Sequence, residues 1–310
     1  MQEMVFVLGC PASGKSTHAQ PLVDQGYHHA NRDKSGGKVI DLLPGVVGAL
    51  KLGKSVVLDN LFTKAEDRAP FLSAAKKAGV EARCVWLDTS IEDGQINALR
   101  RMWKHYRKIF WTADDLKPIK SPNMFPVSVL FAYRKNFEAP STAEGFIEVK
   151  KVKFVRQPWE YTGKAVILDA DDTVRQSAGT KPYPIAVKEV KILPNRKAVL
   201  ERWQKQGYVL LGASNQSAIS KGELTDETAK ACFDRTNELL GVSVDWLYCP
   251  HRIPPLSCYC RKPQSGMLVH HIEKHKLNPK DCIFVGDSTT DKTGAGRLGM
   301  QFEDAMKFFK

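Results

Sequence analysis

The segment GCPASGKST at residues 9–17 constrains the fold more than any other, because it follows the apolar run of residues 4–8 without a break. A short apolar run predicts a buried strand, and residues 15–25 then read as a helix. The spacing Gly-x4-Gly-Lys-Ser is that of a phosphate-binding loop, whose glycines let backbone N–H groups approach an anion. A strand, this loop and a helix in that order predict a parallel α/β sheet.

The side chains of this loop predict a nucleotide site. Lys15 is placed to bridge terminal phosphates, and the Ser16 hydroxyl to ligate Mg²⁺. The start of the helix adds partial positive charge. A chance glycine-rich turn is the alternative, which the flanking strand and helix disfavour. We therefore expect bound ATP to contact Gly9, Ser13, Gly14, Lys15, Ser16 and Thr17.

Short apolar runs alternate with helical patterns along both halves of the chain, which predicts parallel sheets joined by crossover helices. The apolar run AVIL at residues 165–168 restarts this alternation. A chain of 310 residues is long enough for two cores. The expected fold is α/β, with two doubly wound parallel-sheet domains at residues 1–157 and 158–310. Strands are expected at 4–8, 55–58, 82–87, 165–168, 208–214 and 282–287, and helices at 65–78, 91–109, 196–206, 226–240 and 266–275.

A second group of acidic residues, DADDT at 169–173, follows the strand that opens the second half. Of Asp169 and Asp171, one carboxylate can attack phosphorus, while the other protonates the leaving oxygen and later activates water. Cations must offset the repulsion between a carboxylate and a phosphate dianion. We expect Asp169, Asp171 and Asp287 to hold Mg²⁺. The same sequence element as Asp287 also offers Asp291 for Mg²⁺. Ser214 and Asn215 end a strand, and Lys262 supplies a cation; these three are further candidates for the site.

Three cysteines and one histidine cluster in the segment CPHRIPPLSCYC. Cys₃His with no open position is typical of structural, tetrahedral Zn²⁺. The alternative is a set of unliganded cysteines beside a solvent-facing histidine. The expected zinc ligands are Cys249, His251, Cys258 and Cys260.

The chain carries a net charge of +12, and both halves are basic. This favours a polyanionic partner such as nucleic acid, although a generically basic surface would give the same count. No uninterrupted apolar stretch is long enough for a membrane span, so no membrane association is expected. The N-terminus does not read as a secretory signal, and a clustered cysteine set favours a reducing compartment. We expect a cytoplasmic protein, or a nuclear one in a eukaryote.

Two further features of the first half leave alternatives open. Asp33, in NRD, could deprotonate an attacking hydroxyl, and Asp59, at a strand end, could orient a metal or bind substrate. Either could instead be a turn or capping residue. The run NALRRMWKHYRKIFW gathers Arg100, Lys104, Arg107 and Lys108 on one helical face, with Arg101 beside it. This face could clamp a phosphoryl group or simply be solvated.

Most of residues 4–147 resembles the kinase domain of polynucleotide 5′-kinase/3′-phosphatases. The likeness rests on GCPASGKST, GYHHANRDK, LGKSVVLDN with the following arginine, and FPVSVLFAYRKNFEAPSTAEGF. It implies that Asp33 is the general base for a polynucleotide 5′-OH and that Arg100 or Arg101 is a lid arginine. It also implies substrate contacts for Asp59 and Arg68.

Residues 164–299 resemble the haloacid dehalogenase (HAD) superfamily of phosphatases, on DADDT, the Ser214-Asn215 pair, Lys262 and FVGDSTTD. The resemblance implies covalent catalysis by Asp169, with Asn215 contacting substrate. Asp172 stands where these enzymes usually have glycine. The Cys/His segment and SNQSAISKGELT are similar to the histidinol-phosphate and heptose-bisphosphate phosphatase branch.

These features favour a bifunctional end-healing enzyme that phosphorylates polynucleotide 5′-OH ends with ATP and removes 3′-phosphates. Its expected partners are DNA or RNA ends and a ligase, which joins such products. One alternative is a small-metabolite kinase fused to a metabolite phosphatase. Another is a nucleic-acid-binding adaptor with decayed active sites, against which Lys15, Asp33, Asp169, Asp171 and Lys262 argue.

Overall fold

The computed structural model describes residues 2–310, which divide into two compact units. The first unit holds the chain up to Ala98 together with Ile119–Arg156, and the second holds Leu99–Pro118 together with Gln157–Lys310. The first unit ends at Arg156, one residue before the boundary expected after residue 157. The assignment of residues 99–118 to the second unit was not expected from the sequence.

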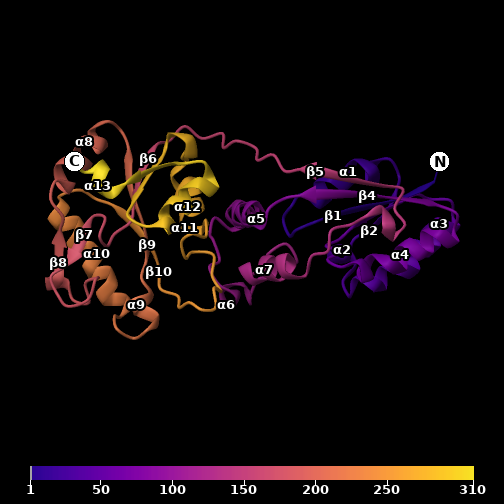
Figure 1. Cartoon of the computed structure of the whole chain (residues 1–310), viewed down its shortest axis with the longest axis horizontal. Coiled ribbons are helices and arrows are strands. Elements are labelled where there is room, and N and C mark those ends of the chain that lie inside the picture. The colour runs from indigo at the N-terminus through magenta and orange to yellow at the C-terminus, as the bar shows by residue number, and fades with distance from the viewer. Residues whose placement is uncertain (1) are drawn as a thin grey trace. The chain divides into compact units, whose positions relative to one another are not determined.

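The first unit is built on a five-stranded, all-parallel sheet of order β2-β3-β1-β4-β5 (Figure 1). Its strands are β1 Glu3–Gly9, β2 His28–Ala30, β3 Val56–Asp59, β4 Glu81–Asp88 and β5 Glu148–Lys153. The helices of this part of the chain are α1 Lys15–Asp24, α2 Arg32–Ser35, α3 Leu43–Lys51, α4 Ala65–Lys77, α5 Ile91–Tyr106, α6 Ala113–Leu116 and α7 Val127–Asn136, with 3₁₀ turns at Val39–Leu42 and Thr142–Glu144.

The central strand β1 is apolar on both faces, as a parallel strand covered by helices must be. Met4 and Phe6 pack with α3 and α4 on one face, whereas Val5 and Val7 pack against α1 on the other. Because β1 lies between β3 and β4, the loop that follows it opens at the carboxyl edge of the sheet, where α/β proteins bind ligands.

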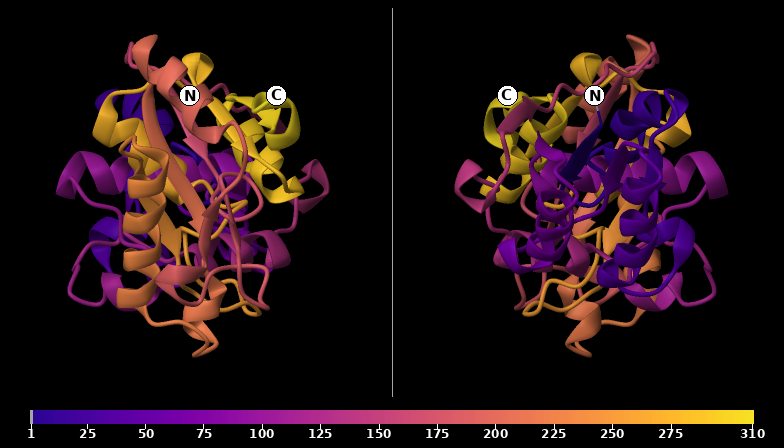
Figure 2. Two further views of the ribbon diagram at one scale, coloured as in Figure 1. Left: turned by 90° about the vertical axis from the view of Figure 1, so that its left-hand side faces the viewer. Right: turned by 90° about the vertical axis from the view of Figure 1, so that its right-hand side faces the viewer.

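The second unit repeats this architecture with a parallel sheet of order β10-β9-β6-β11-β12 and an antiparallel pair β7-β8. The left view of Figure 2 shows α10, in orange, running alongside the strands. The strands are β6 Ala165–Leu168, β7 Arg175–Ser177, β8 Val190–Ile192, β9 Val209–Asn215, β10 Asp245–Cys249, β11 Ile283–Gly286 and β12 Gln301–Asp304. The helices are α8 Arg196–Lys205, α9 Ser217–Ser220, α10 Asp226–Leu240, α11 Gly266–His275, α12 Thr289–Leu298 and α13 Ala305–Phe308, with 3₁₀ turns at Val187–Glu189 and Pro279–Asp281.

The catalytic candidates of the second unit lie at the carboxyl edge of its sheet. Val166 and Leu168 of the central strand β6 pack with residues of α8, α10 and the chain end on one face. The neighbours of β6 are β9 and β11, so residues that follow these three strands meet at the carboxyl edge. The expected doubly wound α/β class is confirmed for both units. Among residues 2–310, no helix is long and apolar enough to span a membrane.

Candidate functional site

The loop after β1 folds as a phosphate cradle. Gly14, with φ of 92°, occupies the N-cap of α1, a left-handed conformation that glycine adopts without strain. A Cβ on Gly9 would lie 2.7 Å from Ser13 Oγ and 2.9 Å from the Leu87 carbonyl oxygen, so only glycine fits there. Lys15 Nζ lies 3.2 Å and 3.0 Å from the carbonyl oxygens of Gly9 and Cys10. The ammonium group is thus held over the loop.

A buried carboxylate lies beside the start of α1. Asp59, at the end of β3, is 2% exposed. Burial opposes ionisation, but hydrogen bonds from His29 and Ser16 hold the pKa of Asp59 below its ordinary value. An ionised carboxylate joined to a hydroxyl, next to Lys15, is a donor set that suits Mg²⁺ bound to a nucleotide. Asp59 thus fits a metal-orienting role, and the sequence did not indicate His29, which lies 3.5 Å from its carboxylate.

Asp33 lies on the exposed side of the short helix α2. Asn31 caps this helix by accepting from the Lys34 amide, and its side-chain amide donates to Asp59 at 2.9 Å. The Asp33 side chain is 40% exposed and pairs with Arg32 at 3.2 Å. An accessible carboxylate on a segment anchored to Asp59 can receive a proton from an incoming hydroxyl.

Arg68 does not face a substrate site, which corrects the sequence-based prediction. Its side chain has no exposed surface and donates two hydrogen bonds to Glu144, at 2.6 Å and 2.8 Å. Further hydrogen bonds reach the carbonyl oxygens of Phe62 and Glu138. A buried guanidinium with its donors used inside the fold is a structural element.

The two candidate lid arginines belong to the part of α5 that groups with the second unit. Arg100 Nε lies 3.3 Å from Glu273 Oε1, and its guanidinium stacks 4.5 Å from the centre of the Trp159 ring. Glu273 also accepts from Trp159 and from Tyr161. Arg100 therefore has a partner within the second unit, and a lid role for Arg100 or Arg101 stays a prediction.

The second cluster forms around Asp169, directly after β6. Lys262 Nζ lies 2.7 Å from Asp169 Oδ1 and 2.7 Å from Asp291 Oδ1. Burial disfavours a charged lysine, but the two carboxylates raise the pKa of Lys262 above its ordinary value. Lys262 is therefore the cation that offsets the negative charge of the cluster, as the sequence predicts.

Ligand atoms of Asp169, Asp287 and Asp291 lie within 4.8 Å of one another. Three carboxylates outnumber the single ammonium of Lys262, and burial raises the pKa of Asp169 to about 6. An oxygen cluster with excess negative charge fits a divalent hard cation such as Mg²⁺. Asp287 and Asp291, both expected near the metal, lie in this cluster, and their binding of Mg²⁺ stays a prediction.

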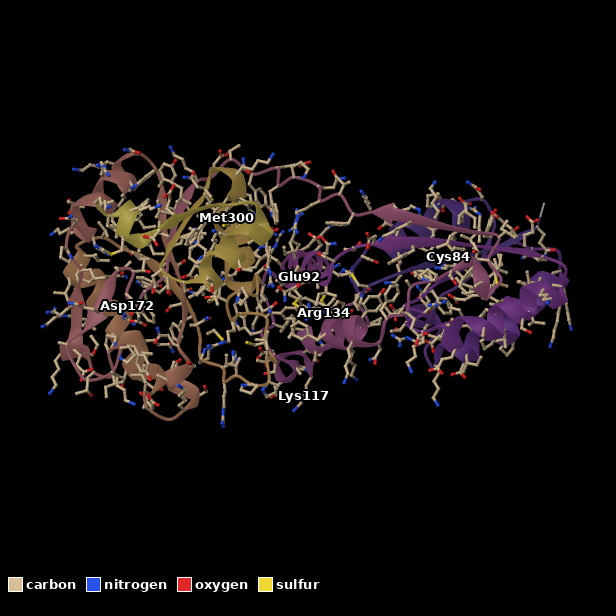
Figure 3. All side chains as sticks on the ribbon, in the orientation of Figure 1. Cys84, Glu92, Lys117, Arg134, Asp172 and Met300 are labelled. Atoms are coloured by element: carbon tan, nitrogen blue, oxygen red, sulfur yellow. The ribbon has the colours of Figure 1, made fainter. Side chains whose placement is uncertain are left out.

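The carboxylate of Asp171 is not among the ligand atoms that lie together in this cluster, so the structure does not support its side chain as a Mg²⁺ ligand. Its Oδ1 accepts from Arg175 at 2.8 Å, and its Oδ2 accepts from Gln216 at 2.7 Å. These bonds fix the orientation of the side chain, and a proton-transfer role for Asp171 stays a prediction. Neighbouring Asp172 is labelled in Figure 3. Its φ of 58° is a left-handed conformation, which aspartate tolerates better than most residues. The sequence did not indicate Arg175 or Gln216, which come from elements brought together only by folding.

Asn215, at the end of β9, forms hydrogen bonds that hold the loop containing Lys262. Asn215 Oδ1 accepts from the Lys262 backbone amide at 3.0 Å, and Asn215 Nδ2 donates to the Lys262 carbonyl at 3.2 Å. Ser214 is 2% exposed and accepts from Gln216 at 3.0 Å. Asn215 thus positions Lys262, while its predicted substrate contact stays a prediction.

The Cys/His segment brings its four candidate ligands together. Cys249 Sγ lies 3.4 Å from His251 Nδ1 and 3.7 Å from Cys258 Sγ, and His251 Nδ1 lies 3.1 Å from Cys260 Sγ. Tetrahedral bonds of about 2.3 Å to sulfur and about 2.0 Å to nitrogen would place ligand atoms roughly 3.5–3.8 Å apart. The first two separations lie close to these values and the third is shorter; the Cys₃His donor set is one that Zn²⁺ accepts.

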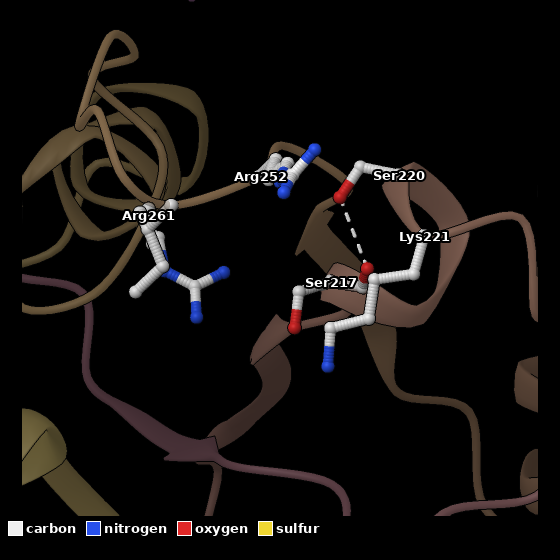
Figure 4. Close-up of a pocket in the computed structure, with 6 residues that line it drawn as sticks. Ser217, Ser220, Lys221, Arg252 and Arg261 are labelled. Atoms are coloured by element: carbon white, nitrogen blue, oxygen red, sulfur yellow. Dashed lines mark hydrogen bonds between the residues drawn. The ribbon is translucent and has the colours of Figure 1, made fainter.

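A basic pocket of about 510 Å³ lies in the second unit (Figure 4). Arg252 lines it from the Cys/His segment and Arg261 from the residue after that segment, while Ser217, Ser220 and Lys221 line it from α9 and the residue after it. Arg261 precedes Lys262 in the chain, and Ser217 follows Asn215 by two residues. Some lining residues of the pocket are therefore close in sequence to residues of the second cluster.

Two family models match the chain, an AAA domain over residues 4–102 and a HAD-hydrolase-like domain over residues 259–302. The chain is 31% identical over 144 residues to a probable D-glycero-D-manno-heptose-1,7-bisphosphate 7-phosphatase of Thermoplasma volcanium, a match covering 45% of this chain and 96% of that protein. It is 32% identical over 156 residues to the bifunctional polynucleotide phosphatase/kinase of Schizosaccharomyces pombe. That match covers 49% of this chain and 34% of the relative, so the chain spans about a third of it.

Solved structures resemble the chain at low TM-scores. The heptose 1,7-bisphosphate phosphatase of B. bronchiseptica, complexed with magnesium and phosphate, gives 0.41 at 28% identity and covers 46% of this chain and 79% of its own. The Pnkp1/Rnl/Hen1 RNA repair complex contains a chain that gives 0.32 at 14% identity, covering 98% of this chain and 95% of its own. Likeness at this level does not identify an activity.

The sequence matches decide the family. The Thermoplasma phosphatase is covered almost completely. The AAA match lies in the first unit except for residues 99–102, and the HAD-hydrolase-like match lies wholly in the second. The chain therefore belongs to the HAD-like phosphatases, and it carries a kinase-like AAA domain ahead of the phosphatase in the same polypeptide.

Proposed function

We propose that this chain repairs nucleic-acid ends, phosphorylating a polynucleotide 5′-OH with ATP and removing a 3′-phosphate. The observation that carries the proposal is the pair of separate phosphate sites, one over Lys15 and one around Asp169, each on its own sheet. The similarity to a protein named polynucleotide phosphatase/kinase supports this choice of substrate. The products carry 5′-phosphate and 3′-OH, which makes a ligase a fitting partner.

In the kinase reaction, Lys15 holds the terminal phosphates and Asp33 accepts the proton of the 5′-OH as its oxygen attacks the γ-phosphorus. The bond from phosphorus to the β-γ bridging oxygen breaks, and ADP leaves. Ser16 and Asp59 would hold Mg²⁺, which neutralises charge on the phosphates. The exposure of Asp33 suits a polymer end, because the acceptor must reach it from solvent.

In the phosphatase reaction, a carboxylate oxygen of Asp169 attacks phosphorus while Asp171 gives its proton to the departing 3′-oxygen. Asp171 then takes a proton from water, which attacks the aspartyl-phosphate and releases inorganic phosphate. Arg175 and Gln216 hold Asp171 in place for both steps. Asp169, Asp287 and Asp291 would hold Mg²⁺, which lowers the repulsion between the carboxylate and the phosphate.

The Cys/His segment is proposed to bind a structural Zn²⁺ through Cys249, His251, Cys258 and Cys260. The segment leads directly to Arg261 and Lys262, so the ion would hold a catalytic lysine in place. Zinc content by mass spectrometry should fall by one equivalent in Cys258→Ser. An unchanged content would contradict this assignment.

The basic pocket supports a nucleotide substrate over a simple phosphate ester. A polynucleotide 3′-phosphate is joined to further phosphodiesters, and Lys221, Arg252 and Arg261 offer three positive charges that we expect to contact them. A bisphosphorylated sugar offers a second phosphate too. The alternative of a metabolite kinase joined to a metabolite phosphatase is favoured by the Thermoplasma relative.

Rates on three substrates distinguish the candidates: a 3′-phosphorylated oligonucleotide, a nucleoside 3′-monophosphate and heptose 1,7-bisphosphate. We expect kcat/KM to be highest for the oligonucleotide and to fall with added salt, since phosphate contacts release counterions. Arg261→Gln should raise KM for the oligonucleotide more than for the mononucleotide, whereas exposed Lys205→Gln serves as a matched control. Highest kcat/KM on the heptose, insensitive to salt, would favour the metabolite enzyme.

A further inference from the structure

A second group of metal-ligand side chains lies in the second unit at the edge opposite the catalytic cluster. Asp245 is the first residue of β10, whereas the catalytic residues follow the last residues of its parallel neighbours. His271 and His275 are four residues apart on α11, which places them on one helical face. One ring nitrogen of each histidine and a carboxylate oxygen of Asp245 all lie within 4.8 Å of one another.

His271 has the hydrogen-bonding pattern of a metal ligand. It has no exposed surface, and its Nε2 lies 2.9 Å from the carbonyl oxygen of Gly212. A carbonyl can only accept, so Nε2 carries the hydrogen and Nδ1 keeps its lone pair. Within residues 2–310, that buried Nδ1 has no hydrogen-bond partner. Metal-bound histidines typically donate their other ring N–H to a carbonyl or carboxylate in this way.

The other two side chains offer the remaining donors and a path from solvent. His275 Nε2 lies 3.1 Å from Asp245 Oδ2, and their side chains are 23% and 40% exposed. Lys274 Nζ lies 2.6 Å from the same carboxylate oxygen and is 46% exposed. The lysine therefore competes with a cation for Asp245, but its long, exposed side chain can turn into solvent.

We propose that Asp245, His271 and His275 bind one divalent transition-metal ion of the zinc class, joining the end of α11 to the start of β10. Two imidazoles and a carboxylate are donors that Zn²⁺, Co²⁺ and Ni²⁺ accept, with water free to take a fourth position. The site shares no residue with the Cys/His segment and lies away from the catalytic edge.

The ion would act on a helix that already connects several parts of the second unit. Glu273, between the two histidines, accepts from Arg100, Trp159 and Tyr161. The site therefore fits a structural ion that fixes α11.

Titration with Co²⁺ tests the proposal, in protein that carries one equivalent of Zn²⁺ for the Cys/His segment and excess Mg²⁺ for the Asp169 cluster. We expect one additional equivalent whose absorption spectrum lacks thiolate-to-cobalt charge transfer. His275→Gln and Asp245→Asn should each weaken this binding at least tenfold, whereas Lys274→Gln should tighten it because a competing cation is removed. His105→Gln is the matched control, since His105 is exposed on α5 and should leave the titration unchanged.

Three outcomes would overturn the proposal. They are Co²⁺ binding of equal affinity in His275→Gln and the parent, binding that is lost in Cys258→Ser, and no equivalent beyond the zinc already bound. Circular dichroism of each variant shows that a weakened titration does not come from unfolding. Because the readout is metal binding, failure here leaves the end-repair proposal unaffected.

Discussion

Replacing Lys262 with methionine should destabilise the second unit as well as abolish the phosphatase reaction. At 2.7 Å from each of two carboxylates, the ammonium has a gross attraction of about 6 kcal/mol per pair at an effective dielectric constant of about 20. The cost of burying the ammonium cancels much of this. Removing one partner of a buried ion pair still costs about 3–5 kcal/mol, because the remaining charges lose their counterion.

Denaturant unfolding without Mg²⁺, followed by tryptophan fluorescence, measures this loss. Five of the six tryptophans lie in the second unit, so the signal reports mainly on that unit. We expect Lys262→Met to lower the unfolding free energy by about 3–5 kcal/mol. Adding Asp291→Asn should recover part of the loss, since one carboxylate no longer needs a counterion. Equal midpoints for Lys262→Met and the parent, at equal slope, would refute the assignment of Lys262 as the central counterion.

Three other substitutions test separate contacts. Gln216→Leu should lower the phosphatase kcat by about 10–100-fold through misplacement of the proton donor and leave kinase rates unchanged; an unchanged kcat would refute that positioning role. Arg68→Met should lower the unfolding free energy of the first unit by about 3–5 kcal/mol, because Glu144 loses its partner; far-UV circular dichroism during denaturant unfolding measures this change. A variant that keeps its stability but loses 5′-end binding would instead support a substrate role for Arg68. The hydrogen bond from Arg83 holds the pKa of Glu3 below its ordinary value, so this stabilisation is present above the unfolded-state pKa and is lost as pH falls through the folded-state pKa. The stability difference between the parent and Glu3→Gln should therefore shrink below about pH 4, and a difference that grows with acidity would contradict the pairing.

Much of the fold follows from local sequence patterns. The apolar runs before Gly9 and Asp169 predict buried parallel strands. The loops that follow these strands carry the candidate catalytic residues, as loops at the ends of parallel strands commonly do. Lys262 could be predicted because its position between the Ser214-Asn215 pair and FVGDSTTD matches the motif order of the HAD superfamily. These motifs are short and contiguous, so they can be recognised without knowledge of the fold.

The remaining features depend on contacts between distant segments. Gln216 and Arg175 reach Asp171 from two different strands, and no spacing in the chain indicates that meeting. The family resemblance implies a substrate contact for Arg68, and the sequence alone does not show that folding buries this arginine against Glu144. The grouping of residues 99–118 with the second unit likewise rests on tertiary packing.

The most direct measurement is end analysis of one oligonucleotide carrying 5′-OH and 3′-phosphate, incubated with ATP and Mg²⁺ and resolved by mass spectrometry. The parent protein should yield 5′-phosphate and 3′-OH. Lys15→Ala should yield only the 3′-OH change, and Asp169→Asn only the 5′-phosphate. An oligonucleotide returned unaltered at both ends by the parent, while a small phosphate ester is hydrolysed, would contradict end repair of nucleic acid.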